Sequence, residues 1–186
     1  MLGDGIIDGE IVPEEIAPQL IPDRDWLTWI DSLPHLLLAG RTNAGKTTIA
    51  KAILADRISR DEPLLVLDPH DQPGKWFGIA AIGGGRDFNA ILDALDQVLI
   101  EMGMRFKDYD QGKKTEEFER LTVLIDEVPA LVASTMDGAR TIDGRWKGFA
   151  KKLGSEARKV RISVILLTQS PLVADLRIRD TTCRAH

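Results

Sequence analysis

The segment Gly40–Thr47, which reads GRTNAGKT, combines residue types and a spacing that can hold phosphate groups. Gly40 and Gly45 allow backbone N–H groups to close around phosphate oxygens, and a helix that starts here directs the positive end of its dipole at them. In such a loop Lys46 reaches the terminal phosphates, and the hydroxyl group of Thr47 holds Mg²⁺. The candidate nucleotide-binding residues are Gly40, Arg41, Thr42, Asn43, Ala44, Gly45, Lys46, Thr47 and Thr48.

The segments on either side of this loop fit the same interpretation. An apolar run, Leu36–Ala39, precedes the loop, and a helix-compatible stretch, Thr47–Ala55, follows it. A strand, a glycine-containing loop and a helix, in this order, form the context of a phosphate-binding loop. The alternative is an ordinary strand-to-helix turn with a buried lysine stem. We therefore predict that the chain binds a nucleoside triphosphate, ATP, together with Mg²⁺.

Two acidic residues, Asp126 and Glu127, directly follow another apolar run, Leu121–Ile125. An acid at the end of a strand beside a phosphate-binding loop can hold Mg²⁺, directly or through water. A second carboxylate close to the γ-phosphate can polarise the attacking water. Because many strands end in solvated acids, the pair is a weak signal alone and gains weight from the loop that precedes it. We predict Asp126 as the residue on the Mg²⁺ side and Glu127 as the catalytic base.

A polar ending also follows the last apolar run, Ile162–Leu167. Pro171 ends that strand and leaves Gln169 in a fixed turn, where its amide can touch the γ-phosphate or the attacking water. A solvated strand terminus is the simpler alternative. Ligands of open parallel sheets lie at the carboxyl ends of the strands, so we expect Lys46, Asp126 and Gln169 to converge there. The predicted catalytic residues are Lys46, Glu127 and Gln169.

The elements that must position these residues alternate between strands and helices from Leu36 onward. Short segments that are apolar on both faces are typical of buried parallel strands, and they are Leu36–Ala39, Leu64–Leu67, Leu121–Ile125 and Ile162–Leu167. Amphipathic segments with helical spacing are Asp87–Lys107 and Trp146–Val160. This alternation predicts an α/β fold with a mostly parallel sheet and helices on both faces. The polar stretch Ala133–Gly144 is expected to be a loop.

Composition narrows the class of protein. Hydrophobic residues make up 44% of the 186-residue chain, which is typical of a globular domain with a core of ordinary size. No apolar run is long enough to cross a bilayer and no secretory signal is apparent, so we expect a cytoplasmic protein. The single cysteine, Cys183, excludes an internal disulfide framework. The net charge of −5 argues against binding nucleic acid over the whole surface. A nucleic-acid contact would need a local basic patch or a pore formed by several copies.

With these motifs placed, the chain from about Leu36 to Pro171 resembles the FtsK/HerA family of P-loop motor ATPases, which pump DNA. Beyond the phosphate-binding loop and the acidic pair, three further segments carry the resemblance. Asp68-Pro69-His70 is similar to the Asp-Pro-His/Lys segment that ends the second strand in this family. The helix that ends near Glu101-Met102 and Arg105 matches in position, and ARKVRISVILLTQSP, residues 157–171, resembles the family's basic helix, apolar strand and Thr-Gln-x-Pro ending.

The resemblance implies a RecA-like P-loop NTPase core, which we assign to residues 31–186. Residues 1–30 are expected to form an N-terminal arm, because residues 1–24 are rich in Gly, Pro, Asp, Glu and Ile without a sustained helical period. The strand before Gln169 would lie between the phosphate-loop strand and the strand before Asp126. It also implies a hexameric ring that threads double-stranded DNA. The chain ends soon after Pro171, whereas family members usually continue through further strands, so the core is expected to be either minimal or truncated at the C-terminus.

An arginine from the neighbouring subunit would complete the site in such a ring. Arg158 and Arg161 are the candidates beside the basic helix-to-strand turn, although arginines there are as readily part of a solvated face. Arg161 stands where a glycine commonly precedes the strand in the family. The other arginines considered are Arg177, Arg179 and Arg184.

Three functions remain open at this point. The leading one is an ATP-hydrolysing motor that moves double-stranded DNA. The Ala133–Gly144 loop and the nearby Arg140, Arg145 and Lys147 would then face a pore and touch phosphates; a merely solvated loop is the alternative. The second is a regulatory or loader ATPase whose nucleotide state controls partner binding without translocation. The third is a kinase, which would need an acceptor pocket and an arginine-rich lid. Glu127 and Gln169 argue for hydrolysis instead.

Overall fold

The computed structural model describes residues 6–7, 10–11, 26–134 and 140–169, and the chain separates into two units, Met1–Ser32 and Leu33–His186. In the first unit, β1 (Ile6–Ile7) and β2 (Glu10–Ile11) pair antiparallel, and α1 spans Trp26–Asp31. The second unit holds the sheet and every residue that we predicted for the site, apart from those that lie outside the described residues. No helix of the described part of the chain is both long and apolar enough to cross a membrane.

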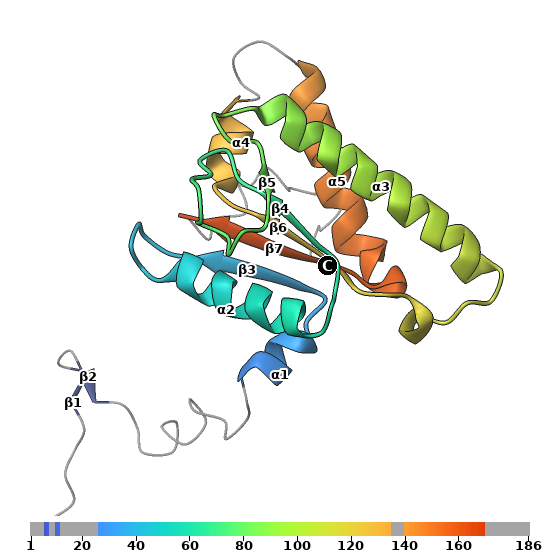
Figure 1. Cartoon of the computed structure of the whole chain (residues 1–186), viewed down its shortest axis with the longest axis horizontal. Coiled ribbons are helices and arrows are strands. Elements are labelled where there is room, and N and C mark those ends of the chain that lie inside the picture. Colours follow the sequence, from blue (N-terminus) through green and yellow to red (C-terminus); the bar gives the residue numbers. More distant parts are fainter. Residues whose placement is uncertain (1–5, 8–9, 12–25, 135–139, 170–186) are drawn as a thin grey trace, which may run out of the picture. The chain divides into compact units, whose positions relative to one another are not determined.

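The second unit is built on a five-stranded sheet in which every pairing is parallel (Figure 1). The strand order is β3-β7-β6-β4-β5. The strands are β3 (His35–Ala39), β4 (Leu64–Leu67), β5 (Ala81–Ile82), β6 (Leu121–Ile125) and β7 (Ile162–Thr168). Four of these strands were predicted, and the place of β7 between β3 and β6 confirms the order that the resemblance implied. The edge strand β5 was not predicted.

The strands are in register at their carboxyl ends. Ala39 pairs with Thr168, and Ile125 pairs with both Leu166 and Leu67. The segments that follow β3, β4, β6 and β7 therefore leave the sheet at one edge. These segments carry the phosphate-binding loop, Asp68, the acidic pair and Gln169, which explains how residues far apart in the sequence come together.

Helices cover both faces of the sheet, as predicted (Figure 1). On one face lies α2 (Lys46–Ser59), and α3 (Phe88–Asp110) and α5 (Arg140–Glu156) lie on the other, with α4 (Val128–Ser134) following β6. Strand residues alternate between these layers: Val123 and Ile125 of β6 belong to the core cluster that includes α3 and α5, whereas Leu124 points to the opposite face. This alternation gives the sheet a core on each side.

The helix α3 follows from the sequence in a direct way. Asp87 caps its N-terminus, because the carboxylate accepts a hydrogen bond of 3.0 Å from the backbone N–H of Ala90. The apolar stripe found in the sequence is buried against the sheet, and it consists of Ile91, Leu95, Val98 and Met102. The guanidinium of Arg145 on α5 binds Asp93 and Asp96 of α3, each at 2.6 Å, and links the two helices.

The prediction of a loop at Ala133–Gly144 is wrong at both ends of the segment. Helix α4 continues to Ser134, and α5 already begins at Arg140 rather than at Trp146; residues 135–139 lie outside the described part. Weak helix formers such as Gly144 do not prevent α5 from starting at Arg140, because tertiary context outweighs local helix propensity. Arg145, one of the basic residues that we expected to face a pore, is bound to Asp93 and Asp96 of α3.

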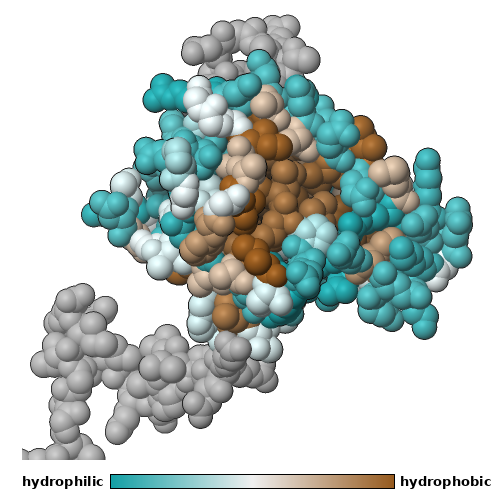
Figure 2. All heavy atoms as spheres, in the orientation of Figure 1, coloured by the Kyte–Doolittle hydropathy of each residue, from teal (hydrophilic) through white to brown (hydrophobic). Residues whose placement is uncertain are grey.

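An apolar hollow of about 270 Å³ lies between β3, β7 and α5. Its walls include Leu37 on the edge strand, Trp146 and Phe149 on α5, and Leu166 on β7. Figure 2, in the orientation of Figure 1, shows apolar side chains gathered over the middle of this view. The charged and polar residues of the predicted site do not contribute to it.

Candidate nucleotide-binding site

The phosphate-binding loop forms the turn between β3 and α2. Its start is tied to the sheet, because the backbone N–H of Gly40 donates a hydrogen bond of 3.2 Å to the carbonyl oxygen of Thr168 on β7. Gly45 has φ +85°, a conformation that side chains disfavour, and it precedes the first residue of α2, Lys46. The helix N-terminus therefore faces the loop, which is the arrangement that attracts phosphate.

The amine of Lys46 folds back over this loop. Its Nζ donates to the carbonyl oxygens of Gly40, at 2.8 Å, and of Arg41, at 3.0 Å. These acceptors are neutral backbone groups at the mouth of the loop, so the ammonium can exchange them for anionic phosphate oxygens, which bind it more strongly. The position of Lys46 thus allows the role that its place in the motif predicts.

A polar cavity of about 370 Å³ lies beside the loop. It is lined by Thr42, Asn43, Ala44, Gly45, Lys46, Thr47, Thr48, Lys75, Asp126 and Glu127. Of the nine loop residues that we predicted for nucleotide binding, seven line this cavity; Gly40 and Arg41 do not, and contribute the carbonyl oxygens that hold Lys46. The structure therefore brings the loop and the acidic pair to one cavity.

Asp126 and Glu127 leave the end of β6 in different conformations. Asp126 is 6% exposed, and its Oδ1 accepts a hydrogen bond of 2.9 Å from the backbone N–H of Glu127. Glu127 has φ +50°, which is uncommon for a residue with a side chain. Its carbonyl oxygen accepts a 2.8 Å hydrogen bond from Ala130 and so starts α4. Backbone strain of this kind is concentrated at functional sites.

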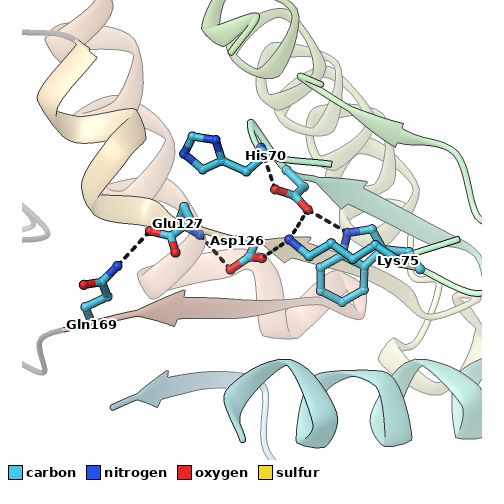
Figure 3. Close-up of polar contacts among 7 residues, drawn as sticks. His70, Lys75, Asp126, Glu127 and Gln169 are labelled. Atoms are coloured by element: carbon cyan, nitrogen blue, oxygen red, sulfur yellow. Dashed lines mark hydrogen bonds and ion pairs between the residues drawn. The ribbon is translucent and has the colours of Figure 1, made fainter. Parts of the chain in front are cut away.

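Gln169 lies next to the catalytic candidate Glu127. The amide Nε2 of Gln169 donates to Oε2 of Glu127 at 3.4 Å, which is a long hydrogen bond, and the glutamine side chain is exposed (Figure 3). Gln169 does not line the cavity itself. It reaches the site through Glu127, so its side chain is placed to orient that carboxylate.

Lys75 is the residue that our sequence analysis missed. It lies on the segment between β4 and β5, and its Nζ donates to Oδ2 of Asp68 at 2.6 Å and to Oδ2 of Asp126 at 2.9 Å (Figure 3). Burial lowers the pKa of Lys75, but the hydrogen bonds to the two carboxylates outweigh burial and raise the pKa above its ordinary value. An ammonium group thus stands against the acid that we assigned to Mg²⁺.

Asp68 belongs to the segment Asp68-Pro69-His70, which carried part of the family resemblance, and its carboxylate is buried and fully hydrogen-bonded. It is fully buried, and besides Lys75 it accepts hydrogen bonds of 2.8 Å from the indole Nε1 of Trp76 and from the backbone N–H of His70. Trp76 is also buried, and the His70 side chain is exposed. Asp68 therefore anchors the segment that presents Lys75 to the cavity.

The residues present fit a magnesium ion. Mg²⁺ takes oxygen ligands and usually binds through one or two protein groups together with phosphates and water, and Thr47 and Asp126 supply such oxygens on the same cavity. The Lys75 ammonium on Asp126 marks a place where positive charge is stabilised. Among the described side chains, no group of three or more His, Cys, Asp or Glu residues could hold a metal by itself, so phosphate and water would complete the coordination.

The arginine candidates lie near the start of β7, at the other end of that strand from Gln169. Arg161 has φ +53°, the left-handed conformation that suits the glycine common at this position, and its guanidinium donates to the carbonyl oxygen of Phe118 at 3.1 Å. Arg158 is exposed. Neither contributes to the cavity of its own chain. Arg177, Arg179 and Arg184 lie outside the described residues.

The chain resembles DNA translocases in its sequence. It is 27% identical over 168 residues to the DNA translocase FtsK of Borreliella burgdorferi, with 75% of this chain and 20% of the relative covered. It is 26% identical over 174 residues to the FtsK of Campylobacter jejuni, with 80% and 17% covered. The chain thus spans about a fifth of the length of these relatives. No protein-family model matches it.

Solved structures share the fold. The pCW3 conjugation coupling protein TcpA, in a monomer form with ATPγS, superposes with a TM-score of 0.63 at 23% identity over 77% of this chain and 46% of TcpA. The type VII secretion ATPase EccC of Thermomonospora curvata gives a TM-score of 0.54 at 17% identity over 77% of this chain and 19% of EccC. The predicted α/β P-loop NTPase fold is confirmed, and the chain is similar to the FtsK DNA translocases, as its motifs indicated.

Proposed function

We propose that residues 31–186 form a Mg²⁺-dependent motor ATPase that couples ATP hydrolysis to the movement of double-stranded DNA, with residues 1–30 as an arm outside that core. The observation that carries this proposal is the polar cavity in which the phosphate-binding loop meets Asp126 and Glu127. The sequence similarity to FtsK DNA translocases supports DNA as the substrate.

The binding step follows from the loop. Backbone N–H groups of the loop and the N-terminus of α2 receive the phosphates, and the Lys46 ammonium leaves the carbonyl oxygens of Gly40 and Arg41 for the terminal phosphate oxygens. Thr47 and Asp126 would hold Mg²⁺. When bound, this ion neutralises charge on the β- and γ-phosphates. The loop thus positions the nucleotide with its γ-phosphate toward the carboxyl ends of β6 and β7.

The hydrolytic step belongs to Glu127 and Gln169. The carboxylate of Glu127, held on the cavity wall by its strained backbone, accepts a proton from the attacking water as general base. The amide of Gln169 donates to the same carboxylate and fixes its direction. Because Gln169 directly follows β7, it links the carboxylate of Glu127 to the strand that pairs with β3, the phosphate-loop strand.

Assembly and partner are the less direct parts of the proposal. The FtsK relatives are named DNA translocases, and we propose that this chain likewise forms a ring, a hexamer, around double-stranded DNA in the cytoplasm. In such a ring an arginine of one subunit reaches the γ-phosphate of the next, and Arg158 or Arg161 are the candidates. The exposure of Arg158 suits this role better than the internal hydrogen bond of Arg161.

Steady-state hydrolysis of ATP with Mg²⁺, measured with and without long double-stranded DNA over a range of protein concentrations, tests the proposal. A ring with a shared site should show turnover that rises with DNA and more than linearly with protein concentration, and Lys46→Ala should remove this activity. A rate of hydrolysis that does not change with DNA would favour the regulatory or loader ATPase over the motor. Transfer of phosphate to an acceptor would indicate a kinase.

A further inference from the structure

The ion pairs of Lys75 connect two carboxylates that have very different surroundings. Asp68 is 0% exposed and receives donors from the His70 backbone and the Trp76 indole in addition to Lys75. Asp126 lies on the wall of the nucleotide cavity, where its Oδ2 accepts from Lys75 at 2.9 Å. A buried carboxylate without a counter-ion is strongly disfavoured, whereas one that faces a polar cavity can exchange its partner. Lys75 is therefore bound firmly to Asp68 and exchangeably to Asp126.

Both carboxylate oxygens of Asp126 already have a donor, because Oδ2 accepts from Lys75 and Oδ1 accepts from the backbone N–H of Glu127. A second cation and the ammonium cannot both neutralise the same carboxylate oxygen, because the two positive charges repel each other over a short distance. The side chain of Lys75 is 23% exposed and its amine already lies 2.6 Å from Asp68, so the amine can turn away from Asp126 while it keeps Asp68 as its partner. Neither of the two ion pairs of Lys75 is needed to bind phosphate, because the loop and Lys46 do so.

We propose that Lys75 is the built-in counter-ion of Asp126 in the nucleotide-free protein, and that binding of a magnesium–nucleotide complex displaces its ammonium from Asp126 while Asp68 retains it. Lys75 is then a positioning residue that sets how much Mg²⁺ the site requires. The inference rests on the proposed function in one respect, that a nucleotide binds with Mg²⁺ at this cavity. Phosphate contacts by Lys75 have no part in it.

The displacement has a local consequence at Trp76. The Lys75 amine lies 5.2 Å from the centre of the Trp76 ring, and the Trp76 indole N–H donates to the same Asp68 oxygen that Lys75 binds. Withdrawal of the ammonium from Asp126 changes its position against this ring. The environment of Trp76 therefore reports on the exchange, independently of any catalytic turnover.

The test measures binding of fluorescent mant-ADP as a function of Mg²⁺ concentration, in the wild type and in Lys75→Met. The Mg²⁺ concentration at half-maximal effect should fall about tenfold in the variant, which corresponds to about 1.4 kcal/mol. Affinity in excess EDTA should stay unchanged, because Lys75 does not hold phosphate. Lys75→Arg, which keeps the positive charge, should behave as the wild type.

A double variant protects the test against misfolding. Lys75→Met leaves Asp68 buried without its counter-ion, whereas Asp68→Asn combined with Lys75→Met removes both charges and keeps one amide oxygen that can accept from the Trp76 indole or from the His70 backbone N–H. The double variant should show the same tenfold fall. In addition, adding Mg²⁺ to the ADP-loaded wild type should change tryptophan emission, and most of that change should be lost in Trp76→Phe.

Three results would overturn the inference. Unchanged Mg²⁺ dependence in the folded double variant would reduce Lys75 to a structural partner of Asp68. A several-fold loss of affinity in EDTA would make it a phosphate ligand instead. A wild type that binds no nucleotide with or without Mg²⁺ would remove the proposed function together with the inference, which separates that failure from the other two.

Discussion

Replacing Lys75 with methionine should destabilise the protein through Asp68 rather than through any lost packing. Asp68 is fully buried, and the substitution leaves its charge with two neutral donors, the Trp76 indole and the His70 backbone N–H, each at 2.8 Å. Removing one partner of a buried ion pair commonly costs about 3–5 kcal/mol. Because those donors remain and the Lys75 side chain is 23% exposed, we expect a smaller loss of about 2–3 kcal/mol in the free energy of unfolding.

Equilibrium unfolding in urea measures this loss by linear extrapolation. For a chain of this length, the same loss lowers the melting temperature by roughly 4–12 °C. Asp68→Asn combined with Lys75→Met is the matched control and should recover part of the stability, since Asp68 no longer carries an unpaired buried charge. If the double variant were as unstable as Lys75→Met, the cost would come from the loss of Lys75 itself, including its contact with Asp126, and the reasoning from Asp68 would be refuted.

The other predictions concern the site and the core. Lys46→Ala should weaken binding of mant-ATP by at least tenfold, because the loop loses its only side-chain ammonium; equal affinity would contradict its assigned role. Glu127→Gln should leave ATP affinity within about twofold while kcat falls by about 10²–10⁴, and single-turnover hydrolysis at the wild-type rate would exclude a general base here. Gln169→Ala should lower kcat about tenfold with little change in binding, in keeping with a single 3.4 Å hydrogen bond to Glu127; a change in KM alone would argue against that contact. Trp146→Ala should cost about 3–5 kcal/mol in urea unfolding, since the indole is 1% exposed and packs 6.0 Å, centre to centre, from Phe149; a loss below 1 kcal/mol would mean that α5 is not part of the core as described.

Much of the sheet could be predicted because its strands are continuously apolar. The bounds of Leu64–Leu67 and Leu121–Ile125 agree with the structure, and β3 and β7 each extend by one residue beyond the prediction. Buried strands of this kind carry a strong local signal. The edge strand Ala81–Ile82 has two residues, too few to show any period, and its pairing with β4 is decided by tertiary packing.

The residues of the site that lie in contiguous motifs could be predicted from the sequence. The residue that reaches the site only through the fold, Lys75, could not. Gly40–Thr48 and the pair Asp126-Glu127 are contiguous in sequence, so their residue types were enough to identify them. Lys75 belongs to no periodic segment, and its partners lie 7 and 51 residues away. They meet only because β4 and β6 are neighbours in the sheet. When the order of the strands brings two charged residues together, the spacing of residues in the sequence does not reveal the pair.

The conformation of Arg161 shows a similar limit. Its φ of +53° is unfavourable for a side chain, and nothing in the local sequence predicts it. The structure supplies compensation, since the guanidinium donates to the carbonyl oxygen of Phe118 and the carbonyl oxygen of Arg161 accepts from the N–H of Leu121 at 3.0 Å. The departure from glycine at this position is thus accommodated by contacts with the segment that leads into β6.

Movement of double-stranded DNA is the central claim, and displacement of a third strand from a DNA triplex tests it most directly. With ATP and Mg²⁺, the wild-type chain should release the third strand from a long duplex at a rate that rises with protein concentration. Release should stop with ATPγS and in Glu127→Gln. Robust ATP hydrolysis without any triplex displacement, on duplex of any length, would contradict the motor and leave the regulatory ATPase.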